Sequence, residues 1–145
     1  MALFDFFAGL FFMGANTLQD IRQRTICVPL SLAYGLYAAA RHLLRGGLPL
    51  LPLLFSLLPG AGLCLLAVLR KGAVGMGDGI VLMALGCRYG AGGALSLFFY
   101  GTVLAAGWGL AGLLRRRCTA GDSLPFMPFL SAAWLLQAAG AAAGL

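Results

Sequence analysis

The carboxylates of this 145-residue sequence are few, since it has four acidic residues, all Asp. Asp20 begins the segment Asp-Ile-Arg-Gln-Arg after an apolar run, and Asp78 ends Gly-Met-Gly-Asp before another. Two carboxylates brought close together do not both ionise easily, so one keeps a proton while the other stays charged. The charged one can take a proton from water while the neutral one protonates a departing amine. Asp20 and Asp78, if they meet, could therefore perform the chemistry of an aspartic peptidase.

Both aspartates also have a purely structural interpretation. Asp20 alone is typical of a charge at the membrane interface, at a helix end that also carries two arginines. Asp78 stands where an N-cap would accept hydrogen bonds from the first turn of a helix. Gly75 and Gly77 favour a function, because glycines leave room for another backbone to come close. We therefore expect these two glycines to shape a peptide-binding loop beside Asp78.

The other chemically capable residues give weaker signals. His42 is the only histidine and follows Arg41, so an interfacial position is expected for it rather than a role beside a nucleophile. The four cysteines lie far apart and form no Cys-x-x-Cys pair, so neither a metal site nor a cofactor is predicted. Asp5 is expected at the interface, and Asp122 is expected in a turn.

The composition predicts that membrane helices position these groups. Hydrophobic residues make up 61% of the chain and charged residues 10%, whereas a soluble domain carries about 25% charged residues. Helices satisfy their own backbone in lipid, and about 20 apolar residues cross the hydrocarbon. Residues 1–145 are therefore expected to form one all-α integral membrane domain, a bundle of six transmembrane helices whose first run is retained as a span. The apolar runs are 6–19, 25–40, 46–69, 72–87, 89–114 and 123–145, of which only 72–87 contains a charge.

The basic residues predict the orientation. The net charge of +6 is distributed in short clusters between apolar runs, which favours contact with anionic lipid headgroups over nucleic acid. With the N-terminus outside, seven basic residues fall on one side and three on the other, so the first side is expected to be cytoplasmic. The chain is then N-out and C-out, and two spans between Asp20 and Asp78 return both to the cytoplasmic face. The seven are Arg22, Arg24, Arg70, Lys71, Arg115, Arg116 and Arg117, and the three are Arg41, Arg45 and Arg88.

Three segments, in order and over nearly the whole chain, resemble the type IV prepilin leader peptidases and preflagellin peptidases, which are GxGD aspartyl peptidases of membranes. The family usually has Ile-Pro-Asn after its first aspartate, where this chain has Cys27-Val28 after Ile26. It often has Lys two residues after the second aspartate, where this chain has Ile80. The matching segments are Asp20-x-Arg22 with Ile26 and Pro29, Gly75-x-Gly77-Asp78 with Ala84-Leu85-Gly86 and Gly90, and Pro125-Phe126-x-Pro128-Phe129.

The resemblance implies a membrane-embedded aspartic endopeptidase of a bacterial or archaeal cell membrane. Asp20 and Asp78 would be catalytic, without a cofactor. The residues expected to bind substrate or shape the loops are Gly75, Gly77, Pro125, Phe126 and Pro128. The partners would be pilin-like precursor proteins, cleaved after a Gly at the end of a short basic leader, and membrane lipids. Larger relatives carry a zinc-binding domain associated with N-methylation, and this sequence has no segment for it.

Two other classes of function are also compatible with the sequence. A small proton- or cation-coupled transporter would also hold acids in a membrane, although such carriers tend to place them near the midplane and to show inverted repeats. A non-catalytic subunit of a pilus or secretion assembly could keep a degenerate peptidase fold, although both aspartates are present here. An assay for removal of the leader from a pilin precursor distinguishes a peptidase from both of these alternatives.

Overall fold

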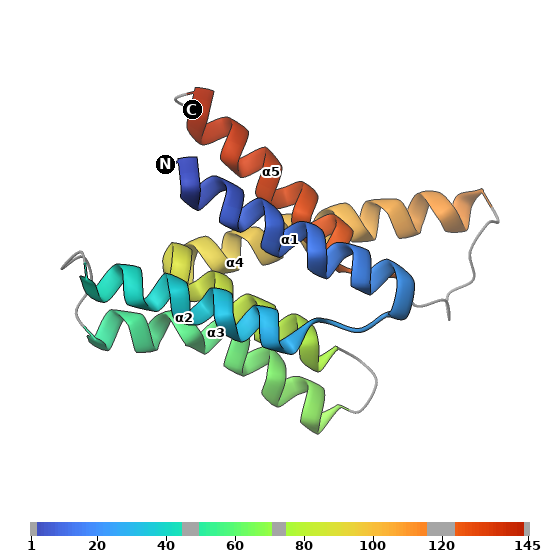
Figure 1. Cartoon of the computed structure of the whole chain (residues 1–145). Coiled ribbons are helices and arrows are strands. Elements are labelled where there is room, and N and C mark those ends of the chain that lie inside the picture. The colour runs from blue at the N-terminus through green and yellow to red at the C-terminus, as the bar shows by residue number, and fades with distance from the viewer. Residues whose placement is uncertain (1–2, 45–49, 71–74, 116–123, 144–145) are drawn as a thin grey trace.

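The computed structural model describes residues 3–44, 50–70, 75–115 and 124–143 (Figure 1). In this part of the chain every regular element is a helix, which confirms the expected all-helical class. Asp122, Lys71, Arg116 and Arg117 lie outside the described residues. The helices are α1 (Leu3–Gln23), α2 (Val28–Leu44), α3 (Leu50–Leu69), α4 (Met76–Leu114) and α5 (Met127–Ala143).

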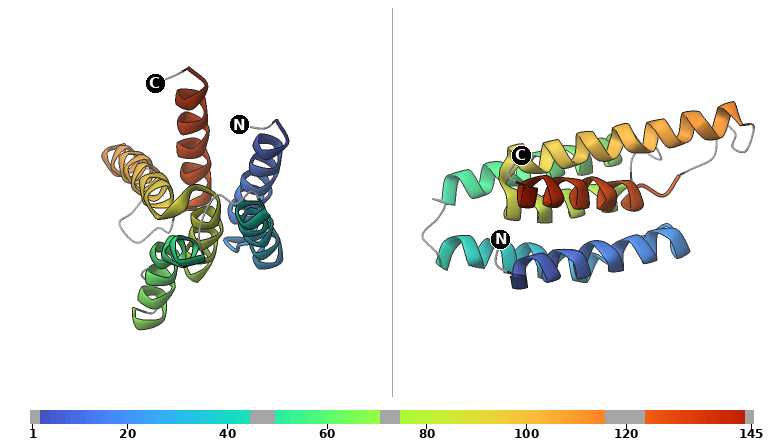
Figure 2. Two further views of the ribbon diagram at one scale, coloured as in Figure 1. Left: turned by 90° about the vertical axis from the view of Figure 1, so that its left-hand side faces the viewer. Right: turned by 90° about the horizontal axis from the view of Figure 1, so that it is seen from above.

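Helix α4 combines two of the six predicted runs, 72–87 and 89–114. Its 39 residues are interrupted at Gly90, where φ is 75° and ψ is 173°, a conformation that is not helical. Figures 1 and 2 show that the chain reverses at this point, so that the two parts of α4 run antiparallel to each other. Within the described residues there are thus five helices rather than six, because a single residue in place of a loop reverses the chain. That each of the six runs crosses a membrane stays a prediction.

Helices α3 and α4 approach each other closely because glycines face the opposite backbone. A Cβ on Gly86 would lie 2.0 Å from the carbonyl oxygen of Ser56 on α3. A Cβ on Gly60 would lie 2.5 Å from the carbonyl oxygen of Gly79. Small residues at such contacts are typical of helices that pack in lipid, where close van der Waals packing drives association. This contact fixes the start of α4, and with it Asp78, against α3.

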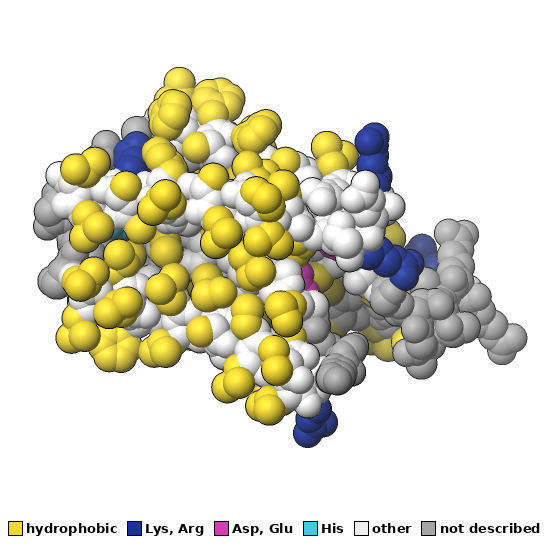
Figure 3. All heavy atoms as spheres, turned by 60° about the horizontal axis from the view of Figure 1, so that its bottom comes forward, with side chains coloured by type: hydrophobic (Ala, Val, Ile, Leu, Met, Phe, Trp, Pro, Cys, Tyr) yellow, Lys and Arg dark blue, Asp and Glu magenta, His cyan; other side chains and the backbone are white. Residues whose placement is uncertain are grey.

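The exterior of the bundle is apolar. Helices α3 and α4 are each long and apolar enough to span a membrane, with mean hydropathies of 2.1 and 1.6 over their best windows. Large side chains such as Phe11, Leu36 and Trp108 are more than 60% exposed. Figure 3 shows hydrophobic side chains spread over the face that it presents. Exposed apolar surface of this extent is unfavourable in water, so lipid is the solvent that suits it.

The core of the bundle joins α1, α2, α4 and α5. The rings of Phe12 and Tyr34 stack with their centroids 4.2 Å apart. Trp134 of α5 is 2% exposed and packs in the same cluster as Leu85 and Leu97 of the two parts of α4. These contacts hold the returning part of α4, and α5 after it, against α1.

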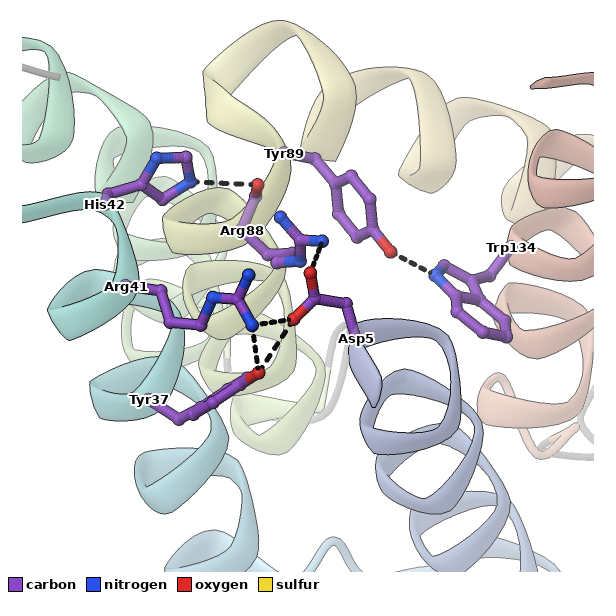
Figure 4. Close-up of polar contacts among 7 residues, drawn as sticks. All are labelled: Asp5, Tyr37, Arg41, His42, Arg88, Tyr89 and Trp134. Carbon is purple, nitrogen blue, oxygen red and sulfur yellow. Dashed lines mark hydrogen bonds and ion pairs between the residues drawn. The ribbon is translucent and has the colours of Figure 1, made fainter. Parts of the chain in front are cut away.

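Asp5 is buried among the helices, which the sequence did not predict, while its expected position at the membrane interface stays a prediction. It is 3% exposed and forms ion pairs with Arg41 of α2 at 2.5 Å and with Arg88 of α4 at 3.3 Å (Figure 4). The hydroxyl of Tyr37 donates to it over 2.8 Å. A carboxylate so enclosed needs these cationic partners, since an unpaired buried charge is costly. His42 lies beside this cluster, with Nε2 3.2 Å from the carbonyl oxygen of Arg88.

The reversal at Gly90 generates a stability prediction. Its combination of φ and ψ is open almost only to glycine, so we expect Gly90→Ala to lower the free energy of unfolding by about 1–3 kcal/mol. Gly92→Ala is the matched control, because a Cβ there meets nothing within 4 Å and its φ is not positive. Thermal unfolding in detergent measures both. Equal unfolding temperatures for the two variants would show that Gly90 is not required for the reversal.

Candidate active site

Asp20 and Asp78 line one cavity, although 58 positions separate them in the chain. The cavity has a volume of about 300 Å³. At about 30 Å³ per molecule of liquid water, it has room for roughly ten waters, or for a short segment of peptide and one reacting water. The lining residues are Asp20, Arg24, Thr25, Ile26, Gly77, Asp78, Leu124, Pro125 and Phe126.

Asp20 lies in the last turn of α1 and is 9% exposed. Its Oδ2 accepts a hydrogen bond of 2.9 Å from the backbone N–H of Met127, the first residue of α5. The first N–H groups of a helix have no partner within it and carry positive partial charge. The start of another helix therefore fixes the position of the Asp20 carboxylate. A charge that only faced the lipid headgroups would not require such a hydrogen bond.

The Pro-Phe-x-Pro segment determines where α5 begins. Pro128 is the second residue of α5, where the missing N–H of proline costs no helical hydrogen bond. The carbonyl oxygen of Phe126 accepts from the N–H groups of Phe129 and Leu130. Pro125 and Phe126 precede the helix and line the cavity, whereas Pro128 is not among the lining residues. The segment thus supplies part of the cavity wall and leaves the N–H of Met127 facing Asp20.

Asp78 is half-buried and is the third residue of α4. The N-cap of α4 is Gly75, whose φ is −71° and ψ 127°, and no side chain caps this helix by a hydrogen bond. The structural alternative for Asp78, an N-cap, is therefore wrong. The N–H of Asp78 donates to the carbonyl oxygen of Gly75 over 3.1 Å, which closes the first turn.

The two glycines before Asp78 have different surroundings. A Cβ on Gly75 would lie 3.1 Å from Oδ2 of Asp78, so a side chain there would press on the carboxylate. A Cβ on Gly77 would lie 2.7 Å from Cδ1 and 3.0 Å from Cβ of Ile26. Ile26 occupies the space that the sequence suggests for a substrate backbone. Gly77 still borders the cavity, so contact with substrate stays a prediction for it.

The connection between α1 and α2 forms another wall of the cavity, which the sequence did not single out. Arg24 adopts a φ of 51°, rare for a residue with a side chain, and its N–H donates to the carbonyl oxygen of Asp20 over 2.9 Å. Asn16, fully buried in α1, accepts from the N–H of Cys27 over 3.1 Å. These contacts turn the chain so that Thr25 and Ile26 face Asp78. A polar Asn one turn before Asp20, inside an apolar run, was the available signal.

The sequence also did not predict a second contact between α1 and α5. The hydroxyl oxygens of Thr17 and Ser131 lie 2.6 Å apart, one turn from Asp20 on α1 and one turn from Met127 on α5. Either hydroxyl can donate. Two short polar residues in apolar runs carry little sequence signal, because such residues occur in many helices without a partner.

No group of three or more metal-binding side chains occurs within the described ranges. Two carboxylates that line a cavity with room for water and a peptide segment can exchange protons with water and with a bound amide.

Fold and cavity together define a class: an all-helical protein with an apolar exterior, in which two carboxylates meet at one end of the bundle. The model of the type IV leader peptidase family matches residues 7–110, a range that contains both aspartates. The chain belongs to the type IV leader peptidase family, as the resemblance of its motifs predicts. No curated protein and no solved structure gives a significant match.

The close contact between Gly77 and Ile26 can be tested by paired substitutions. Gly77→Ala should lower the unfolding temperature in detergent and the activity, because the added methyl group overlaps Ile26. Ile26→Ala in the same chain removes the overlapping atoms, so the double variant should regain at least part of both properties relative to Gly77→Ala. Gly62→Ala is the control, since a Cβ there meets nothing within 4 Å. If Ile26→Ala only adds its own loss to that of Gly77→Ala, the steric account of Gly77 is wrong.

Proposed function

We propose that this chain is a membrane-embedded aspartic endopeptidase that removes the short leader from type IV pilin-like precursors at the cytoplasmic face. One observation carries the proposal: Asp20 and Asp78 line the same cavity in a member of the type IV leader peptidase family. Neither carboxylate is used by a salt bridge within the described residues, in contrast to Asp5. Two acids that line one cavity and form no salt bridge within the described residues fit an acid–base role better than a structural one.

The proposed reaction is hydrolysis of one peptide bond. The ionised carboxylate removes a proton from a water in the cavity, and the oxygen of that water attacks the carbonyl carbon of the scissile bond. The protonated carboxyl then gives its proton to the nitrogen, and the C–N bond breaks to leave an amine and a carboxylic acid. The enzyme ends with the proton on the other aspartate, and exchange with water restores the pair.

The shape of the protein suits a substrate that is half apolar and half polar. The exterior of the bundle matches lipid, so an apolar substrate helix can reach the protein within the bilayer. The cavity lies where α1 ends and α4 and α5 begin, at one end of the bundle. A peptide bond at the end of that substrate helix would therefore reach Asp20 and Asp78 while its leader remains among the headgroups.

The distribution of arginines supports the cytoplasmic assignment of this end. Arg22 lies in the last turn of α1 and Arg24 just after it, and Arg70 and Arg115 follow the ends of α3 and of the returning part of α4. At the other end, Arg41 and Arg88 are ion-paired with Asp5. Basic residues near the ends of spans favour the cytoplasmic side.

The catalytic assignment predicts the effects of two substitutions. Asp20→Asn and Asp78→Asn should each reduce the rate of leader removal by about 10²–10⁴-fold, because Asn cannot exchange protons. Both proteins should remain folded, since the side-chain oxygen of Asn can still accept from the N–H of Met127 at position 20. Mass spectrometry of a purified pilin precursor measures the rate. A rate near that of the unchanged protein in either variant would remove that aspartate from the mechanism.

Asp5→Asn provides the contrasting variant. It leaves Arg41 and Arg88 without their buried partner, so it should lower the unfolding temperature more than either change at the cavity. Cleavage should persist at temperatures at which this variant is folded, because Asp5 does not line the cavity. Loss of cleavage by a folded Asp5→Asn protein would mean that the reaction is not confined to the Asp20–Asp78 pair.

Membrane orientation is tested in a variant without the native cysteines. A cysteine at the exposed position of Arg22 should not react with a membrane-impermeant thiol reagent added outside intact cells. A cysteine at Leu44, 86% exposed at the end of α2, should react from outside. The reverse pattern would place the cavity on the outer face.

A further inference from the structure

Helices α1 and α5 are joined by two polar contacts, one turn apart. Asp20 accepts from the N–H of Met127 over 2.9 Å. Thr17 and Ser131 share a hydrogen bond of 2.6 Å, and Thr17 also donates to the carbonyl oxygen of Met127 over 3.4 Å. Because the helices are antiparallel, a step of three residues back along α1 matches a step of four along α5. The second contact therefore sets the register in which the first can form.

The two catalytic carboxylates differ in their hydrogen bonds. Asp20 receives a backbone N–H at the positive end of a helix, which favours its ionised form. The side-chain carboxylate of Asp78 accepts no hydrogen bond from any residue in the described ranges. The charged groups that line the cavity around them are Asp20, Asp78 and Arg24, from α1, from α4 and from the connection after α1. The segment before α5 contributes Leu124, Pro125 and Phe126, which carry no charge.

We propose that the start of α5, held in register by the hydrogen bond between Thr17 and Ser131, keeps Asp20 as the ionised, water-activating member of the pair and leaves Asp78 as the proton donor. Thr17 and Ser131 are then positioning residues, which act through Asp20 and do not touch substrate. The catalytic part of this inference rests on the proposed peptidase function. The protonation part concerns the pair itself and can be tested without substrate.

Without the Thr17 hydroxyl, α5 loses the contact that fixes its first turn against α1. The N–H of Met127 then moves away from Asp20, and the ionised form of Asp20 loses its stabilising donor. The proton held by the pair becomes shared between two more equal carboxyls, and less of the enzyme has the arrangement that activates water.

The first readout is kinetic. Thr17→Val, which keeps the shape of the side chain and removes the hydroxyl, should lower kcat for leader removal by about 10–100-fold, as expected for a displaced catalytic group, with KM changed little. Thr17→Ser keeps the hydroxyl and should restore most of kcat. Thr102→Val is the matched control, because the hydroxyl of Thr102 is exposed and donates only to the carbonyl oxygen of Phe98 in its own helix.

The second readout is the protonation of the carboxyls. The chain has four Asp and no Glu, so the full-length protein labelled with ¹³C at Asp Cγ gives four side-chain carboxyl signals, assigned by single Asp→Asn variants. As the pH is lowered, the first proton taken up by the pair should shift the Asp78 signal while the Asp20 signal stays at the carboxylate position. In Thr17→Val the two signals should shift together, and in Thr102→Val they should behave as in the unchanged protein.

Each outcome decides the inference. A first proton on Asp20, or a Thr17→Val protein with unchanged kcat and unchanged carboxyl signals, overturns it. A lower kcat with unchanged carboxyl signals also overturns it, since Thr17 would then act otherwise than through Asp20. If Thr17→Val does not fold, Ser131→Ala removes the other hydroxyl and is judged by the same criteria. If the unchanged protein cleaves no pilin precursor, the proposed function fails, while the carboxyl signals still decide the order of protonation.

Discussion

A buried carboxylate needs a hydrogen-bond donor, and in this protein Asp20 finds one in the first N–H of the last helix. That single bond joins residues 107 positions apart and depends on most of the fold. Helix α5 must begin at the end of the bundle where α1 ends. It can do so only because α4 reverses at Gly90 and carries the chain back to that end. The Pro-Phe-x-Pro segment then starts the helix at the residue whose N–H meets the carboxylate.

The two ends of the bundle treat acidic side chains in opposite ways. Near the reversal of α4, Asp5 is neutralised by two arginines and a tyrosine from neighbouring helices, which ties three helices together (Figure 4). At the other end, Asp20 and Asp78 line one cavity. A fully paired carboxylate is a poor acid or base, whereas a pair of facing carboxylates with access to water can move protons. The fold therefore separates an acid used for stability from two that remain available for reaction.

Much of the fold could be predicted from the sequence, because lipid restricts the choices. A chain with so few charges has to form helices, and its apolar runs locate them to within a few residues. The two apolar runs on either side of Arg88 predict a reversal of the chain there, but the sequence does not show that it is made without a loop. The backbone geometry of Gly90 is what allows the chain to turn without a loop. The burial of Asp5 could not be predicted either. Its partners Arg41 and Arg88 are distant in sequence, and an isolated Asp near a chain end is usually exposed.

For the site, the sequence by itself determined which residue types are present and that two apolar runs separate Asp20 from Asp78, which predicts that both lie at the same end. The glycine motif marked Asp78, and the proline motif marked the wall of the cavity. Tertiary structure alone decided that Asp78 is not an N-cap and that Ile26 fills the space beside Gly77. It also decided that the N–H of Met127 meets Asp20, and that Thr17 and Ser131 join the same two helices one turn away. The physical reason is that these contacts join helices through single atoms in a particular register. Apolar periodicity specifies which face of a helix is buried but not which backbone donor that face will meet.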